Sequence, residues 1–163
     1  EEEIPLTAEI DLYVTDDPVR PHITADFRHT HGRQVWGLFE DKYAAYDEPL
    51  EKPRAIICVA YTNQVPTNEH ELEWFSTATG TGAVSTTTAV FYTVWSYDRG
   101  AGREVVNTVA EWIRDNRPVS KWVTLSPLTE MAEKFHTRNG AVKHSVYDTC
   151  QVFDYTHALI GEE

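Results

Sequence analysis

Short apolar stretches separated by polar segments with glycine or proline run along the whole chain, and this pattern predicts alternating strands and helices. Alternating or continuous apolar positions rich in β-branched and aromatic residues mark the strands. The predicted strands are 10–14, 34–39, 54–62, 86–97, 119–125, 141–147 and 150–155. The run 54–62 is almost continuously apolar, which is typical of a strand buried in the middle of a sheet.

The clearest helix is predicted over 104–116, directly after the strand 86–97. Its apolar residues recur at i, i+4, i+7 and i+8, so they form one stripe along the helix. These residues are Val105, Val109, Trp112 and Ile113. Pro118 follows, and the helix is expected to end before it.

A second helix is predicted to begin after a cap at Ser126 or Thr129 and to end at Asn139-Gly140. Its inner face is expected to carry Leu128, Met131, Ala132 and Phe135. Shorter helical pieces are predicted near 23–24 and over 69–75. The mixture of strands and helices in 163 residues, with no repeat or linker, indicates one α/β (α+β) domain over 1–163.

Composition narrows the class of protein. The formal net charge is −12, and 14 Lys+Arg stand against 26 Asp+Glu. This balance disfavours nucleic acid as a partner without excluding it, and favours cationic, amine-bearing substrates. No apolar run is long enough to cross a bilayer and no secretion signal is visible, so a cytoplasmic protein without a membrane partner is expected, as a monomer or homodimer. Cys58 and Cys150 are expected to be buried, reduced thiols, with a disulfide between them as the alternative.

The most informative segment is the glycine-containing loop between the strand 86–97 and the helix after it. Arg99, Gly100, Ala101 and Gly102 occupy this turn. Amides left bare by glycine, together with the positive end of the helix dipole, form a cradle for phosphate groups. The segment is neither a P-loop nor a dinucleotide fingerprint, because the further lysine or glycines of those motifs are missing.

Together with the later ending Phe135-His136-Thr137-Arg138-Asn139-Gly140-Ala141, this loop resembles the GNAT superfamily of N-acetyltransferases. The family's loop pattern is Gln/Arg-x-x-Gly-x-Gly/Ala, and Arg99 and Gly102 match it with the family's spacing. The recognisable motifs lie within 94–141. The resemblance implies a mixed, twisted sheet of six to seven strands with helices on both faces, opened at a cofactor cleft between the fourth and fifth strands.

The resemblance also implies acetyl-CoA as the cofactor and transfer of its acetyl group to a primary amine on a small molecule or a protein. It assigns to cofactor binding Val94, Trp95, Ser96, Arg99, Gly100, Ala101, Gly102, Arg103, Glu104 and Asn139. Glutamates often serve as the base in this family, and the acidic candidates here are Glu40 and Glu73, with Glu71 and Asp98 behind them.

Two positions depart from the family pattern. Glu104 stands near the expected pyrophosphate, where the family usually has Gly or Ala, and would repel it unless it points away or pairs with Arg103. His136 stands where many members carry a tyrosine that protonates the departing thiolate, so it is a candidate acid, with an inert surface histidine as the alternative.

Other constellations are weaker. His22, His29 and His31 lack a further ligand at convincing spacing, so no metal is expected. Arg20 and Arg28 are expected at the surface. Two other functions stay open: a DNA-base modification enzyme similar to phage Mom proteins, which would act in a host cytoplasm, and a non-catalytic binding module with the same fold.

Overall fold

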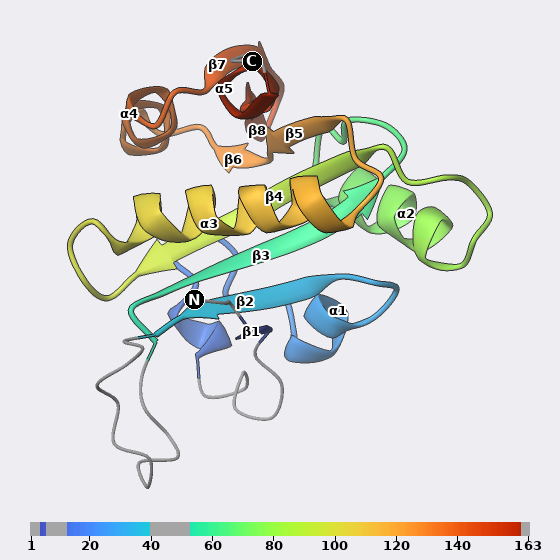
Figure 1. The fold of residues 1–163 in the computed structure, drawn as a ribbon, viewed down its shortest axis with the longest axis horizontal. Coiled ribbons are helices and arrows are strands. Elements are labelled where there is room, and N and C mark those ends of the chain that lie inside the picture. The colour runs from blue at the N-terminus through green and yellow to red at the C-terminus, as the bar shows by residue number, and fades with distance from the viewer. Residues whose placement is uncertain (1–3, 6–12, 40–52, 161–163) are drawn as a thin grey trace, which may run out of the picture.

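The structure is a computed structural model that describes residues 4–5, 13–39 and 53–160. A curved mixed sheet runs through the molecule in the order β1-β2-β3-β4-β5-β8-β6, with β7 paired to β8 (Figure 1). Six described strands have four or more residues: β2 (Gln34–Leu38), β3 (Ala55–Thr62), β4 (Thr88–Ser96), β5 (Lys121–Thr124), β7 (Val142–Val146) and β8 (Cys150–Asp154). Two-residue pairings form β1 (Ile4–Pro5) and β6 (Ser126–Pro127).

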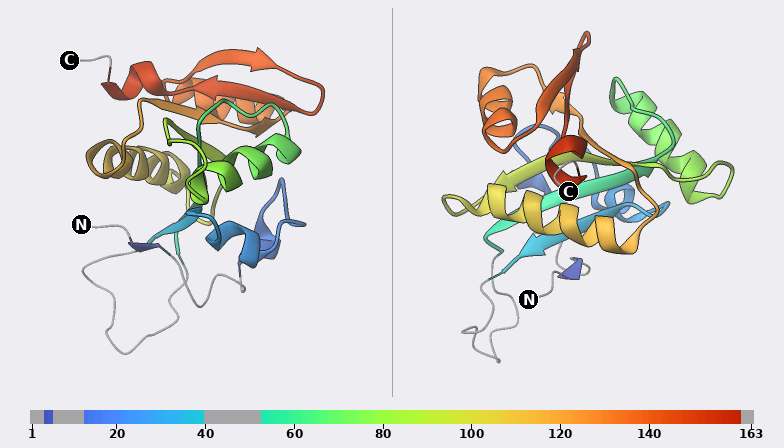
Figure 2. Two further views of the ribbon diagram at one scale, coloured as in Figure 1. Left: turned by 90° about the vertical axis from the view of Figure 1, so that its right-hand side faces the viewer. Right: turned by 45° about the horizontal axis from the view of Figure 1, so that its top comes forward.

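Helices cover both faces of this sheet. The longest, α3 (Ala101–Asn116), packs Val105, Val109 and Ile113 against one face. The opposite face carries α1 (Ala25–His29) and α2 (Glu69–Gly80), as Figure 2 shows. Two further helices, α4 (Glu130–Arg138) and α5 (Thr156–Ile160), lie beside the β7–β8 hairpin. This arrangement confirms the GNAT-like mixed α/β fold.

β4 and β5, the strands predicted as the fourth and fifth, separate as expected. β4 and β5 run parallel and are in register only from Thr88↔Lys121 to Phe91↔Thr124, with one more bond from the Leu125 amide to the Phe91 carbonyl at 3.1 Å. β4 continues to Ser96 without pairing to β5. A bulge at the same level adds to the divergence, because Cys58 pairs with Thr93 and Val59 with Phe91, which leaves Tyr92 as the extra residue.

Several local predictions need correction. Tyr13 and Val14 were expected at the end of a strand, but they lie in a turn and a 3₁₀ helix (Val14–Asp16), because Asp17 and Pro18 bend the chain there. α2 extends to Gly80, well beyond the predicted 69–75, and α3 begins at Ala101 rather than at 104. The side chains of Leu128 and Met131, expected on the inner face of α4, are 47% and 80% exposed.

The N-terminal arginines also differ from expectation. Arg20 and Arg28 are buried on the face of the sheet that carries α1 and α2, at 1% and 0% exposure, because each finds an anionic partner there. Cys58 and Cys150 are buried free thiols, as expected. None of the helices in the described ranges is both long and apolar enough to span a membrane.

Candidate active-site cleft

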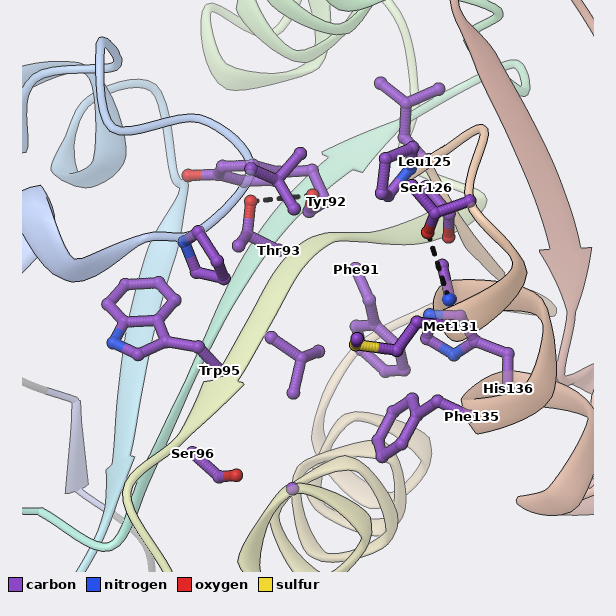
Figure 3. Close-up of a pocket in the computed structure, with 17 residues that line it drawn as sticks. Phe91, Tyr92, Thr93, Trp95, Ser96, Leu125, Ser126, Met131, Phe135 and His136 are labelled. Carbon is purple, nitrogen blue, oxygen red and sulfur yellow. Dashed lines mark hydrogen bonds between the residues drawn. The ribbon is translucent and has the colours of Figure 1, made fainter.

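A cavity of about 630 Å³ opens where β4 leaves β5, and its walls include β4, the residues that directly follow β5, and α4. Val94, Trp95 and Ser96, the residues of β4 that are predicted to bind the cofactor, line it. Phe135 and His136 face them from α4, and Leu125 closes the end near the strand junction (Figure 3). We call this cavity the strand cleft.

A second hollow of about 450 Å³ continues from the strand cleft between α3 and α4. The two share Ser96, Gly102, Met131 and Phe135 in their walls. The second hollow carries the cationic residues Arg103, Lys134 and Arg138, so we call it the cationic mouth. Gly100 and Asn139, two further residues predicted to bind the cofactor, also line it.

The backbone at the start of α3 has the features expected of an anion cradle. Gly100 takes the N-cap position with a φ of 81°, in the left-handed region that favours glycine, and no side chain caps the helix. The Gly102 and Arg103 amides have no acceptor within the described part of the chain. Bare amides at a helix N-terminus attract phosphate.

Gly102 has a second role, in the passage between the two cavities. A Cβ atom placed on it would lie 3.4 Å from the Phe135 ring and 3.8 Å from the Ser96 Cβ. A larger side chain would therefore fill the passage that joins the strand cleft to the cationic mouth.

Glu104 is turned away from this cradle. Its carboxylate pairs with Arg54 at 3.2 Å, and the same guanidinium contacts Asp98 at 3.2 Å. Neither cavity includes Glu104 in its walls. The departure from the family pattern is thus accommodated by Arg54, rather than by the alternative partner Arg103.

His136 is buried at 7% exposure and lines the strand cleft, so it is not a surface histidine. Its Nδ1 atom lies 2.8 Å from the Tyr155 hydroxyl, and its ring stacks on Phe153 with centroids 5.4 Å apart. Burial lowers the pKa of His136 to about 4, so the imidazole is neutral near pH 7. Burial likewise raises the pKa of Tyr155 to about 12, which keeps the phenol protonated beside it.

The acidic candidates that the structure describes, Glu71, Glu73 and Asp98, do not line the cleft. Glu73 lies on α2, in a separate hollow with His70 and Trp74. Glu71 accepts hydrogen bonds from Thr67, and Asp98 pairs with Arg54. Glu40 lies outside the described residues.

The remaining candidates lie around the cradle without entering it. Arg99 and Ala101 flank Gly100 but line neither cavity. Among the described residues, no group of three or more potential metal ligands occurs.

Sequence reasoning missed Lys134 and Arg138, although both are spaced to reach one face of α4. They lie four residues apart, and Met131 and Phe135 share the same hollow. It also missed Pro18 and Val19, which wall the strand cleft from the N-terminal segment. Only the tertiary fold brings that segment to β4.

Comparison with known proteins gives a likeness at the level of fold. No family model matches the chain, and no curated protein does. The malonyl-CoA decarboxylase of Agrobacterium vitis is similar with a TM-score of 0.60 and 22% identity, over 83% of this chain and 35% of that one. The Rhodopseudomonas palustris enzyme gives 0.51 and 22%, over 83% and 32%. The chain therefore spans about a third of the length of either enzyme.

Proposed function

We propose that the protein is an acyl-CoA-dependent N-acyltransferase, with acetyl-CoA as the first donor to test and a primary amine as acceptor. The observation that carries the proposal is the continuity of two cavities of opposite character. The cationic mouth and the bare α3 amides suit the phosphates of coenzyme A. The largely apolar strand cleft suits its pantetheine arm.

The strand cleft leads from the cradle to His136, so an arm that enters from α3 would place its thioester near the imidazole. Residues 94–96 lie along the same wall, and their amides are the candidates for polarising the thioester carbonyl. The fold shared with two enzymes named for a CoA thioester supports this assignment of the donor.

The neutral state of His136 changes the role we propose for it. With Nδ1–H donating to the Tyr155 oxygen, Nε2 keeps a lone pair for the cleft. As the amine nitrogen attacks the carbonyl carbon and the carbon–sulfur bond breaks, Nε2 takes the amine proton and passes it to the thiolate sulfur. His136 thus acts first as a base and then as the acid, which needs no proton held beforehand.

The test is an acetylation screen over amines with acetyl-CoA, preceded by calorimetric titration of coenzyme A. Wild type is expected to bind coenzyme A and to release free thiol only when an acceptor is present. His136→Phe should lower turnover by roughly 10²-fold, the usual scale for losing a proton-transfer group, with coenzyme A affinity little changed.

Tyr155→Phe serves as the matched control, because it removes only the hydroxyl that orients the imidazole. It should cost less than His136→Phe. Undiminished turnover in His136→Phe would exclude the proton-transfer role. Binding of coenzyme A without turnover of any amine would instead favour the non-catalytic module.

A further inference from the structure

The inner end of the strand cleft is mainly apolar, and its polar positions are uncharged hydroxyl groups and His136. Figure 3 shows Leu125 and Tyr92 at the end of the cleft away from Ser96 and Phe135, with His136 on the wall between them. Pro18 and Val19 add apolar surface from the N-terminal segment. The wall therefore continues beyond the imidazole, where the acyl group of a bound thioester would lie.

The polar side chains on this wall are largely satisfied within the protein. Thr93 donates to the Tyr92 carbonyl at 2.7 Å, and the hydroxyls of Ser126 and Thr124 are 2.7 Å apart. The Thr129 hydroxyl oxygen accepts from the Ala132 amide at 3.1 Å, as the cap of α4. The Thr129 O–H, which has no acceptor among the described residues, and the neutral imidazole of His136 therefore remain for a ligand along this wall, and neither carries a charge.

No Asp, Glu, Lys or Arg lines the strand cleft within the described ranges. Arg20 lies behind the wall, but its guanidinium donates to Glu69 at 2.8 Å, to the Leu125 carbonyl at 2.8 Å and to the Tyr92 carbonyl. These two carbonyls lie where the β4–β5 ladder ends, so the guanidinium replaces the strand partners that they lose. The charge and the N–H donors of Arg20 are therefore used within the protein and are not available to a ligand in the cleft.

The acidic residues behind the same wall, Asp17 and Glu69, also have partners within the protein. One Asp17 oxygen accepts from the Val19 and Arg20 amides at 2.9 and 2.8 Å, and the other accepts from Arg28 at 2.9 Å. Glu69 binds both Arg20 and His22. Burial raises the pKa of Glu69, but the hydrogen bonds from His22 and Arg20 outweigh it, so its pKa is lowered overall and the carboxylate stays ionised.

A charged acyl group would thus enter a region with no counter-ion on the described walls. A carboxylate such as that of malonyl would lose its hydration without gaining a cationic partner, which is unfavourable. A hydrocarbon chain would instead cover apolar surface that an acetyl methyl group is too short to reach.

We infer that the acyl group this cleft takes is a neutral aliphatic chain longer than acetyl, and not a dicarboxylic group such as malonyl. The inference rests on the proposed binding of acyl-CoA and specifies the acyl part of that donor. It separates this chain in substrate chemistry from the enzymes whose fold it shares.

The test is a calorimetric series with coenzyme A, acetyl-CoA, butyryl-CoA, hexanoyl-CoA and malonyl-CoA. Affinity should rise from acetyl to hexanoyl by up to roughly fourfold for each methylene that is fully buried. Malonyl-CoA should bind more weakly than acetyl-CoA. Equal affinities along the series, or tighter binding of malonyl-CoA than of butyryl-CoA, would overturn the inference while leaving the binding of coenzyme A intact.

Val19 is a half-buried residue of the cleft wall, on a segment without regular secondary structure. Two variants at this position test the preference for chain length and the preference for charge separately. Val19→Trp should abolish the gain from acetyl to hexanoyl and leave the affinity for coenzyme A itself unchanged. Val19→Lys supplies the missing cation and should raise the affinity for malonyl-CoA relative to butyryl-CoA. An unchanged chain-length series in Val19→Trp would also contradict the inference. Failure of coenzyme A to bind wild type would remove the proposed function, and this inference with it.

Discussion

Arginines stand at both ends of the cleft, but their surroundings give them different uses. At the inner end, Arg20 is buried and bound to Glu69 and to two backbone carbonyls. At the outer end, Arg103 and Arg138 are exposed and make no ion pair with another described residue. A buried guanidinium needs every donor satisfied, whereas an exposed one keeps its donors available for a ligand.

An acidic chain can attract an anionic cofactor when its exposed cations gather at the entrance of the binding site. The net charge of −12 describes the whole chain, but the local charge at the mouth is positive. Cations that structure the inner end contribute little to binding there, because their partners neutralise them. The following predictions test whether the outer end binds the phosphates while the charged groups at the inner end stabilise the fold.

The largest effect is expected for Gly102→Val, which places a branched side chain in the passage between the two ends. Coenzyme A binding should be lost at concentrations that saturate wild type, because the side chain would meet Phe135 and cover the α3 amides. Calorimetry measures the affinity, and the melting temperature checks the fold. Thr108→Val, a β-branched change on α3 that lines neither cavity, should bind normally. Retained affinity in Gly102→Val would remove the cradle from the account.

The inner end should also govern acid stability, through His136. Its pKa is lowered in the folded state, so the unfolded chain binds the proton more readily and stability falls as pH falls from about 6.5 through 4. The free energy of unfolding should drop by about 3 kcal/mol from this group over that window. Denaturant titrations of wild type and His136→Gln at several pH values measure the difference. Parallel pH profiles for the two proteins would mean that the imidazole titrates normally.

At the outer end, removal of one exposed cation should weaken binding moderately. Arg138→Ala should lower the affinity for coenzyme A several-fold at low salt, by roughly 1 kcal/mol, and less at high salt because exposed charges are screened. Arg114→Ala, the same charge change near the other end of α3, is the control and should have little effect. Equal losses in both variants would indicate a general effect of net charge.

The smallest effect is expected at Glu104, which the Arg54 pair holds away from the mouth. Glu104→Ala should leave coenzyme A affinity equal or slightly improved, since a carboxylate near the cradle is removed. A large loss, measured by the same titration, would give Glu104 a positive role in binding.

Much of the fold could be predicted from the sequence because apolar periodicity, glycine turns and helix caps involve residues that are close together in the chain. The apolar stripe of α3 and the glycines at its start identify the β4–α3 unit, and Thr129 and Gly140 mark the ends of α4. The resemblance to the acetyltransferases supplied the order of the elements and the separation of β4 from β5.

What could not be predicted depends on partners far apart in the chain. Arg20 contacts Glu69, Tyr92 and Leu125 only in the folded protein. An arginine in a polar, proline-containing segment was therefore predicted to be exposed. The burial of His136 follows from Phe153 and Tyr155, which come later in the chain. The exposure of Met131 follows from the rotation of α4, which periodicity did not fix.

The central claim is that one ligand occupies both ends of the cleft at once, with phosphates at α3 and an acyl thioester near His136. Amide chemical-shift perturbation on adding a non-hydrolysable acyl-CoA analogue tests it most directly. The account predicts saturable shifts for both 100–104 and 91–96, with a common dissociation constant, and no comparable change in α2 around Glu73. Shifts confined to α2, or shifts at 100–104 without any at 91–96, would contradict it.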